Sequence, residues 1–216
     1  MRLRHARVEL ELHVLSQHDG PALLLLHELG GSSADWGEMA AAWSGSVFGL
    51  DFSGHGRSER MRGGVYQPEL LAADADAALA EIGPAMLIGA GVGAYVALLL
   101  AGGRPDLVPA ALLLPGRGLA GGGPQPNWDR SSVATLDPAQ HAPLPDGCDP
   151  QCCGLENDPR PPDYAAHFGR AARRLLLFED GSPRPPWWHA VGGEVVSGTP
   201  VEALQKLHSP LLHSPL

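Results

Sequence analysis

The stretch Ala85–Tyr95, AMLIGAGVGAY, decides the fold of this chain. Its first four residues form a short apolar run, which is typical of a strand covered on both faces of a sheet. Three glycines then alternate with Ala90 and Val92, and the apolar segment that continues to about Ala101 predicts a helix. Small residues on both sides of the central Gly91 leave room for a sharp turn, so we expect a tight corner between the strand and the helix.

The pattern of strands and helices continues on both sides of this corner. Residues 8–14 alternate between apolar and polar side chains, which predicts a half-buried strand in an N-terminal hairpin. Apolar runs predict further strands at residues 22–26, 47–50, 107–114, 173–178 and 194–197, and helices are expected at 35–43 and 68–82. Strands that alternate with helices imply an α/β fold, with a mostly parallel sheet and helices on both faces.

The length and charge of the chain limit the class of protein. Its 216 residues suit one α/β domain, so we expect residues 1–216 to share a single core. Much of the high glycine and proline content lies between Pro115 and Pro162, which indicates a loop-rich insert. The net charge of −9 comes without a basic stripe, so we expect no nucleic-acid partner. No run approaches about 18 uninterrupted apolar residues, so we expect no membrane span.

The three cysteines, Cys148, Cys152 and Cys153, lie in one loop. An odd number in one cluster does not suggest a disulfide framework, and the N-terminal residues lack the apolar core of a signal peptide. We therefore expect a reducing, cytoplasmic location. Even with His141 upstream, the spacing is not a usual zinc pattern, so the sequence predicts no metal and no cofactor. No base is placed beside these thiols by the sequence, so a cysteine nucleophile is not expected.

Three segments, in the right order and spacing, resemble the α/β-hydrolase superfamily. They are His27–Ser33, similar to an oxyanion loop, Asp51–Ser58, similar to a D-x-x-G-H-G-x-S turn, and Gly89–Gly93 at the site of the G-x-S-x-G elbow. The resemblance covers residues 20–115 well and residues 173–205 more loosely. It implies the α/β-hydrolase fold, with residues 115–172 as a reduced cap or lid.

The resemblance also implies a degenerate catalytic triad. The centre of the elbow is a nucleophilic serine in this superfamily, but Gly91 stands there, so no acyl-enzyme can form at this position. The acid position falls on Gly181 or Asp180, and the histidine position falls on Thr199. The joint replacement indicates a pseudoenzyme rather than a standard Ser-His-Asp hydrolase.

Other groups near the elbow could still stabilise charge or transfer protons. The backbone amides of Leu29 and Val92 are oxyanion-type donors. Glu28 replaces the usual glycine of the oxyanion loop, and we expect its carboxylate to face solvent because Glu is rarely buried unpaired. We expect His27, His55 and Asp51 to hold loops through hydrogen bonds to the backbone rather than to catalyse. The candidates for proton transfer, if catalysis remains, are Glu28, His27, His55 and Asp180.

The segment Gly89–Tyr95 also resembles the N-myc downstream-regulated family. That family has the hydrolase fold, a G-x-G-x-G-A-Y type of elbow and no recognised hydrolase triad. The match is local, because residues 115–172 do not obviously follow that family. It implies a precedent for an elbow that no longer catalyses.

These observations lead to one main hypothesis and two alternatives. The main hypothesis is a non-hydrolytic α/β-hydrolase-fold protein that binds a small apolar or carbonyl ligand, or a protein partner, at the old pocket or its rim. The first alternative is a hydrolase, lyase or isomerase that acts on a small carbonyl substrate by a non-triad mechanism. The second is an active hydrolase with a serine at Ser53, Ser58 or Ser182, although their turn positions argue against it. The oligomeric state is left open.

The space above Gly91 distinguishes the first two hypotheses. An open, polar pocket there favours an enzyme. A pocket that is filled by Tyr95, by Trp128 or by the insert favours a scaffold.

Overall fold

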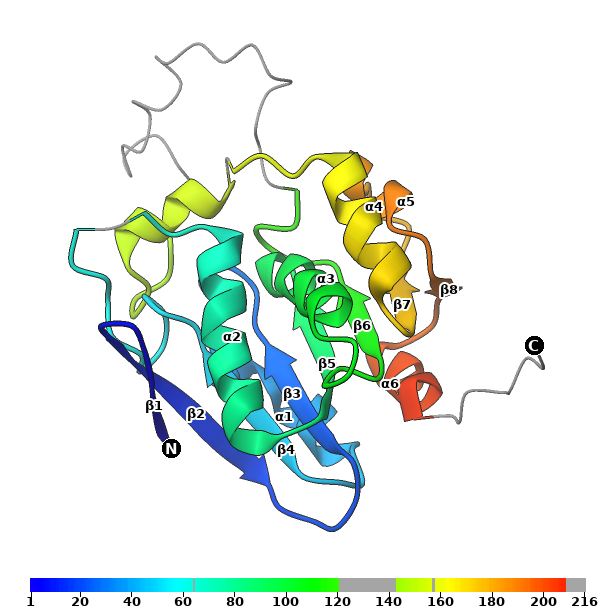
Figure 1. The fold of residues 1–216 in the computed structure, drawn as a ribbon, viewed down its shortest axis with the longest axis horizontal. Helices are drawn as coiled ribbons and strands as arrows, with labels where there is room; N and C mark the ends of the chain where they lie inside the picture. The colour runs from blue at the N-terminus through cyan, green and yellow to red at the C-terminus, as the bar shows by residue number, and fades with distance from the viewer. Residues whose placement is uncertain (64, 121–142, 157, 209–216) are drawn as a thin grey trace.

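The computed structural model describes residues 1–63, 65–120, 143–156 and 158–208. Eight strands form one sheet, in the order β1-β2-β4-β3-β5-β6-β7-β8 (Figure 1). The strands are β1 (Arg2–His5), β2 (Val8–Ser16), β3 (Ala22–Leu26), β4 (Val47–Asp51), β5 (Ala85–Ala90), β6 (Ala111–Leu114), β7 (Leu175–Phe178) and β8 (Glu194–Val196). The helices are η1 (Ser33–Trp36), α1 (Gly37–Ala41), α2 (Pro68–Ile82), α3 (Val92–Gly103), η4 (Pro150–Glu156), α4 (Pro162–Ala171), α5 (Pro186–Ala190) and α6 (Pro200–His208).

The direction of the strands confirms the predicted fold class. Strands β1 and β2 form an antiparallel hairpin, and β2 pairs antiparallel with β4. All pairs from β4 through β3, β5, β6 and β7 to β8 are parallel. The sheet is therefore mostly parallel, with the hairpin at one edge, as expected for an α/β-hydrolase fold.

Two apolar cores cover the two faces of the sheet, and β3 contributes to both. Leu24 and Leu26 of β3 join the core that includes residues of α2 and α3, whereas Leu23 and Leu25 join the core that includes residues of α1 and α6. Successive side chains of a strand point to opposite faces, so a continuous apolar run is what a doubly covered strand requires. Figure 1 shows α2, α3 and α4 on the near side of the sheet, with α1 and α6 behind it.

The main differences from the sequence-based expectations concern β6, α4 and α6. Strand β6 begins at Ala111 rather than at residue 107, because the amides of Leu107 and Val108 donate to the carbonyl of Arg104 in a turn after α3. Helices α4 and α6 were not predicted. Each begins at a proline. The first turn of a helix accepts proline, because the N–H groups of that turn have no hydrogen-bond partner within the helix. Helix α4 packs against α3 and α5 in the helical layer.

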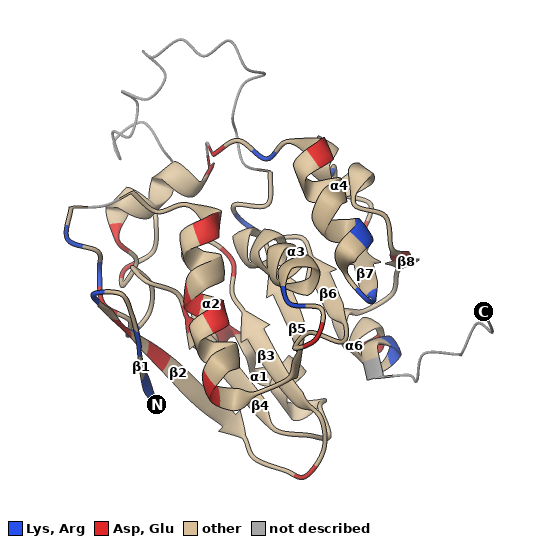
Figure 2. Ribbon diagram, viewed as in Figure 1, with Lys and Arg blue, Asp and Glu red and all other residues tan. Residues whose placement is uncertain are grey.

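The surface carries charges of both signs. Figure 2 shows acidic residues along α2 and basic residues on separate elements that include β1, α4 and α6. Among the described residues, no helix combines the length and the apolar character that crossing a membrane requires.

Candidate functional site

The corner between β5 and α3 has the shape of a nucleophile elbow. Gly91 lies at the N-terminus of α3 with φ 56° and ψ −121°, a conformation that glycine adopts at little steric cost. A Cβ atom added at Gly89 would collide with the carbonyl of Gly93, and one added at Gly93 would collide with the carbonyl of Leu26. The flanking glycines are therefore required by the close approach of the backbone on both sides.

The space above Gly91 is filled by a segment of the insert, Pro115–Leu119. A Cβ added at Gly91 would collide with the carbonyl oxygen of Arg117 and lie 2.8 Å from Cβ of Glu28. The amide of Val92 donates to this same carbonyl oxygen at 3.1 Å, and the amide of Leu29 donates to it at 3.2 Å. The two amides converge on one oxygen, as the donors of an oxyanion hole do, but the oxygen belongs to the protein.

The carboxylate of Glu28 holds the same segment in place. Its Oε2 accepts a hydrogen bond of 2.6 Å from the amide of Arg117. The expectation of a solvated Glu28 was wrong, because the peptide of Arg117 offers the carboxylate a donor that the sequence pattern does not reveal. The guanidinium of Arg117 donates to Glu156 at 2.8 Å and to the carbonyl of Pro143 at 3.0 Å, so the backbone and the side chain of Arg117 are both anchored.

Arg160 anchors the C-terminal end of the Pro115–Leu119 segment. Its side chain is almost fully buried, and Nη1 donates to the carbonyl oxygens of Gly118 and Leu119. The guanidinium also pairs with Asp158 at 2.9 Å and lies 4.8 Å from the ring centroid of Tyr95. These contacts of a buried cation hold the Pro115–Leu119 segment in one position.

His27 serves the loops around the corner. Its Nε2 accepts a hydrogen bond from the amide of Phe52 at 3.1 Å, and its Nδ1 lies 2.7 Å from the carbonyl oxygen of Glu28. The two contacts together require the neutral tautomer with the proton on Nδ1. Burial, and secondarily the nearby His55, lower the pKa of His27 to about 3, so the ring stays neutral and supports the backbone.

Asp51 closes the turn that follows β4. Its carboxylate accepts hydrogen bonds from the amides of Ser33 at 2.8 Å and Arg57 at 2.9 Å, and it lies 3.0 Å from Nε2 of His13. Burial alone would raise the pKa of Asp51, but the hydrogen bonds from Ser33 and Arg57 outweigh it, and the pKa is lowered. Asp51 therefore holds the loops of Ser33 and Arg57 together, as expected for a loop anchor.

We expect Asp51→Asn to destabilise the protein at neutral pH and to weaken its response to acid. A carboxyl whose pKa is lower in the folded state contributes stability that is present above its unfolded pKa of about 3.9 and is lost as the pH falls through the folded pKa. The Asn side chain also replaces one acceptor oxygen with an NH2 donor that faces an N–H donor, at a cost of about 1–3 kcal/mol. Urea unfolding of both proteins from pH 7 to pH 3 measures the difference, which should shrink below about pH 4. A difference that is independent of pH would contradict this role.

Three residues are candidates for the two other triad positions, and their surroundings are local. Asp180 is exposed and accepts hydrogen bonds from the amide of Ser182 at 2.9 Å and from Arg184 at 2.8 Å, which lower its pKa. Gly181 has φ 82° with open space around it. Thr199 Oγ1 accepts from the amide of Glu202, whose carboxylate accepts from the amide of Thr199, and this reciprocal pair caps α6. A polar cap is sufficient to explain a threonine at this position.

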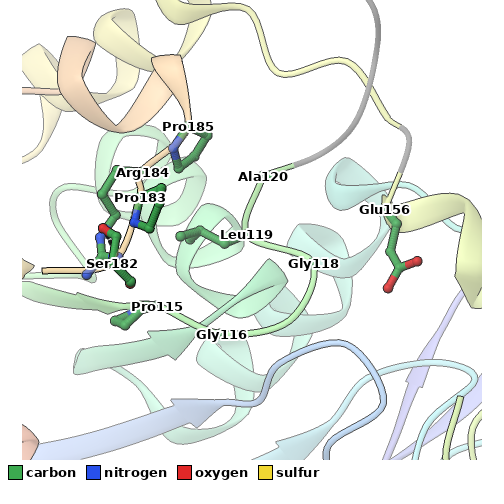
Figure 3. A pocket seen from close by; sticks show the side chains of 10 residues that line it. All are labelled: Pro115, Gly116, Gly118, Leu119, Ala120, Glu156, Ser182, Pro183, Arg184 and Pro185. Atoms are coloured by element: carbon green, nitrogen blue, oxygen red, sulfur yellow. Dashed lines mark hydrogen bonds between the residues drawn. The ribbon is translucent and has the colours of Figure 1, made fainter. Parts of the chain in front are cut away.

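A cavity of about 520 Å³ lies beside the filled elbow, at the carboxyl ends of β6 and β7. Figure 3 shows the segment from Pro115 to Ala120 between Glu156 on one side and the turn from Ser182 to Pro185 on the other. Open α/β sheets bind ligands at this edge. Gly91 and the four candidates Glu28, His27, His55 and Asp180 are not among its lining residues, which are Pro115, Gly116, Gly118, Leu119, Ala120, Glu156, Ser182, Pro183, Arg184 and Pro185.

A second cluster brings together His55, Cys148 and Cys152, all of them buried. Nδ1 of His55 lies 3.9 Å from Sγ of Cys152, so the fold places a base beside a thiol, contrary to the expectation from the sequence. A hydrogen bond with Cys152, together with His55, lowers the pKa of the Cys148 thiol to about 5, whereas the pKa of Cys152 is raised by its hydrogen bond with Cys148 and by burial. The signal was missed because about 90 residues separate the histidine from the cysteines.

Some residues considered in the sequence analysis lie outside the described part of the chain. They are Trp128 and His141, which belong to residues 121–142 of the loop-rich insert.

Comparison with protein families gives one match. The family model described as "Serine aminopeptidase, S33" matches residues 19–128, which is just over half of the chain and includes the oxyanion loop, the turn after β4 and the elbow. Comparison with curated proteins gives no match.

Comparison with solved structures shows similarity along nearly the whole chain. A hypothetical protein from Pseudomonas aeruginosa PAO1 is similar with a TM-score of 0.72 and 17% identity, over 96% of this chain and 95% of that one. A variant of an N-formylmaleamic acid deformylase from Pseudomonas putida S16 has a TM-score of 0.65 and 15% identity, over 91% and 90%. A bottromycin epimerase in complex with bottromycin A2 has a TM-score of 0.63 and 19% identity, over 96% and 94%. At these identities the similarity shows the fold.

Proposed function

We propose that this chain, which belongs to the serine aminopeptidase S33 family of α/β hydrolases, is a non-hydrolytic member that binds a small, largely apolar ligand. One observation carries this proposal. The carbonyl oxygen of Arg117 accepts hydrogen bonds from the amides of both Leu29 and Val92 and occupies the space above Gly91. A substrate carbonyl cannot take that position while the segment Pro115–Leu119 is in place.

The replaced side chains support the same proposal. Gly91 offers no nucleophile, and Thr199 caps α6 where the family places a histidine. Glu28 is bonded to the amide of Arg117, and His27 is held between the backbone of Glu28 and Phe52, so neither is available to move a proton. The local resemblance to the N-myc downstream-regulated family supports an elbow kept for structure.

The cavity beside the segment is the site we propose for the ligand. Its lining consists mainly of proline, glycine, leucine and alanine, which favours an apolar ligand. The polar groups at its edge already have partners within the protein, since Arg184 donates to Ser182 and to the carbonyl of Phe178. A compact apolar molecule, with or without a carbonyl group, suits this lining. The cytoplasmic location inferred from the cysteines stays a prediction.

We expect the purified protein to hydrolyse p-nitrophenyl esters of short and medium chain length no faster than buffer does. The reason is the joint absence of a nucleophile at Gly91 and of a vacant oxyanion hole. A colorimetric esterase assay at pH 7–8 is the measurement. Turnover that disappears in Glu28→Gln would show that the chain is an enzyme with a non-triad mechanism.

Binding can be tested separately from hydrolysis by thermal shift with a library of small apolar compounds. Ala120→Trp introduces a bulky side chain at the exposed rim of the cavity and should abolish the shift caused by any true ligand. Ala80→Trp, at an exposed position on α2, is the matched control and should leave the shift unchanged. A shift that survives Ala120→Trp would place the ligand elsewhere.

The alternative of a non-triad enzyme makes a different structural demand. The segment Pro115–Leu119 would have to leave the elbow, which breaks the hydrogen bonds to Leu29, Val92 and Glu28. The similarity to an epimerase concerns the fold and does not remove this requirement.

A further inference from the structure

We propose that His55, Cys148 and Cys152 form a binding site for a thiophilic metal ion, with Zn²⁺ as the natural candidate. This site is separate from the elbow and from the cavity, and it does not depend on the proposed function. The two thiols and the imidazole are buried, and one ligand atom from each lies within 4.8 Å of the others.

The spacing of the three side chains is close to what a zinc ion needs. Zn–S bonds of about 2.3 Å and Zn–N bonds of about 2.0 Å place the ligand atoms of a tetrahedral site about 3.5–3.8 Å apart. One ring nitrogen of His55 and the two sulfur atoms lie within 4.8 Å of one another. The imidazole also contacts Cys152 directly, since its Nδ1 is 3.9 Å from Sγ of that residue. Small side-chain adjustments would bring them to bonding distance. The three ligands leave a fourth tetrahedral position for a water molecule.

The imidazole of His55 has an unused ring nitrogen. Its Nδ1 lies 3.2 Å from the carbonyl oxygen of Ser53, and Nε2 has no hydrogen-bond partner among the described residues. Buried polar atoms are usually paired, so an unpaired nitrogen in a fully buried ring needs an explanation. Metal-binding histidines commonly donate one ring N–H to a carbonyl and use the other nitrogen as the ligand. Ser53 provides that carbonyl.

The loops that carry the ligands are bonded directly to each other. The amide of Asp149 donates to the carbonyl of Gly54 at 2.7 Å, which joins the turn after β4 to the loop before η4. The hydroxyl of Tyr66 donates to the carboxylate of Asp149 at 2.9 Å and accepts from the amide of Met61 at 2.9 Å. The ligands are thus positioned by contacts that do not involve the thiols, which limits the entropy cost of binding.

The charge and the protons balance in such a site. Binding of Zn²⁺ forms two Zn–S bonds and one Zn–N bond, and each S–H proton that is still bound passes to solvent, with no change of oxidation state. Two thiolates neutralise the two positive charges, so the buried complex carries no net charge. Thiolate and imidazole ligands together favour Zn²⁺ or Cu⁺ over Mg²⁺ and Ca²⁺, which prefer oxygen.

Titration of the reduced, metal-free full-length protein with Co²⁺ tests the proposal, because cobalt reports its ligands by absorption. We expect one equivalent to bind, with a thiolate-to-cobalt charge-transfer band, and Zn²⁺ to displace it. A pH indicator should record between one and two protons released per Zn²⁺ at neutral pH. Absence of the thiolate band, or release of no protons, would overturn the proposal without any variant.

Variants identify the ligands. Cys148→Ser, Cys152→Ser and His55→Gln should each weaken Zn²⁺ affinity at least tenfold and alter the cobalt spectrum. Cys153→Ser is the matched control, because Cys153 is equally buried beside Cys152 but lies outside the cluster, and it should bind as the unmodified protein does. Binding unchanged in both Cys148→Ser and Cys152→Ser would refute the site. Formation of a Cys148–Cys152 disulfide, with no metal bound by the reduced protein, would assign the cluster to redox chemistry instead.

Discussion

Gly91→Ser should leave the protein without esterase activity and lower its free energy of unfolding by about 3 kcal/mol. The new side chain would collide with the carbonyl of Arg117 and crowd Glu28, and overpacking of this kind costs about 1–3 kcal/mol. A serine held at φ 56° and ψ −121° adds backbone strain of about 1–3 kcal/mol. Urea unfolding at pH 7 and the esterase assay measure the two effects.

Gly83→Ser is the control for the cost of placing a serine at positive φ. Gly83 also has positive φ, at 80°, but a Cβ there meets nothing within 4 Å. The difference between the two variants therefore isolates the collision with the Pro115–Leu119 segment. Equal destabilisation by both changes would mean that the segment does not fill the elbow in solution. Ester hydrolysis by Gly91→Ser would contradict the proposed non-hydrolytic function.

Arg160→Met should destabilise the protein by about 3–5 kcal/mol, because it removes one partner of a buried ion pair and leaves the other charge uncompensated. Asp158 would lose its ion-pair partner, the guanidinium of Arg160, and the carbonyls of Gly118 and Leu119 would lose their hydrogen-bond donor. Burial raises the pKa of Asp158, and the hydrogen bond and charge of Arg160 oppose this effect, so removal of Arg160 should raise that pKa further. Urea unfolding at pH 7 measures the loss of stability.

Arg160→Met should also loosen the segment above the elbow. The amides of Leu29 and Val92 donate to Arg117, so their hydrogen exchange should become faster in this variant. Arg104→Met is the matched control, because Arg104 makes a two-pronged pair with Asp76 at the surface, and surface pairs contribute little. Unfolding and exchange that are unchanged in Arg160→Met would show that Arg160 does not anchor the segment.

Most of the fold could be predicted because its signals are local. Helix α2 has the predicted bounds, and β3 and the other central strands have the continuous apolar runs that doubly covered strands need. The elbow could be located because the approach of Leu26 and Gly93 excludes side chains there, and glycine is the residue that allows this. Helix α4 was missed because the prolines before it also suit a loop.

The candidate site was less predictable, because its contacts join distant parts of the chain. Glu28 meets the amide of Arg117 across 89 positions, and Cys152 meets His55 across 97. Neither pair leaves a periodic or local signal, since the path of the insert over the sheet brings the partners together. The assignment of Glu28 to solvent was wrong for this reason.

The sequence by itself determined the α/β fold, the elbow and the glycine at its centre, because strand and helix patterns and steric limits at a tight turn act over a few residues. Only the tertiary structure decided what lies above the elbow. The carbonyl of Arg117 lies between the amides of Leu29 and Val92, because Glu28 and Arg160 hold its segment there. Long-range packing of loops on the sheet sets that arrangement, and no local pattern in the chain encodes it.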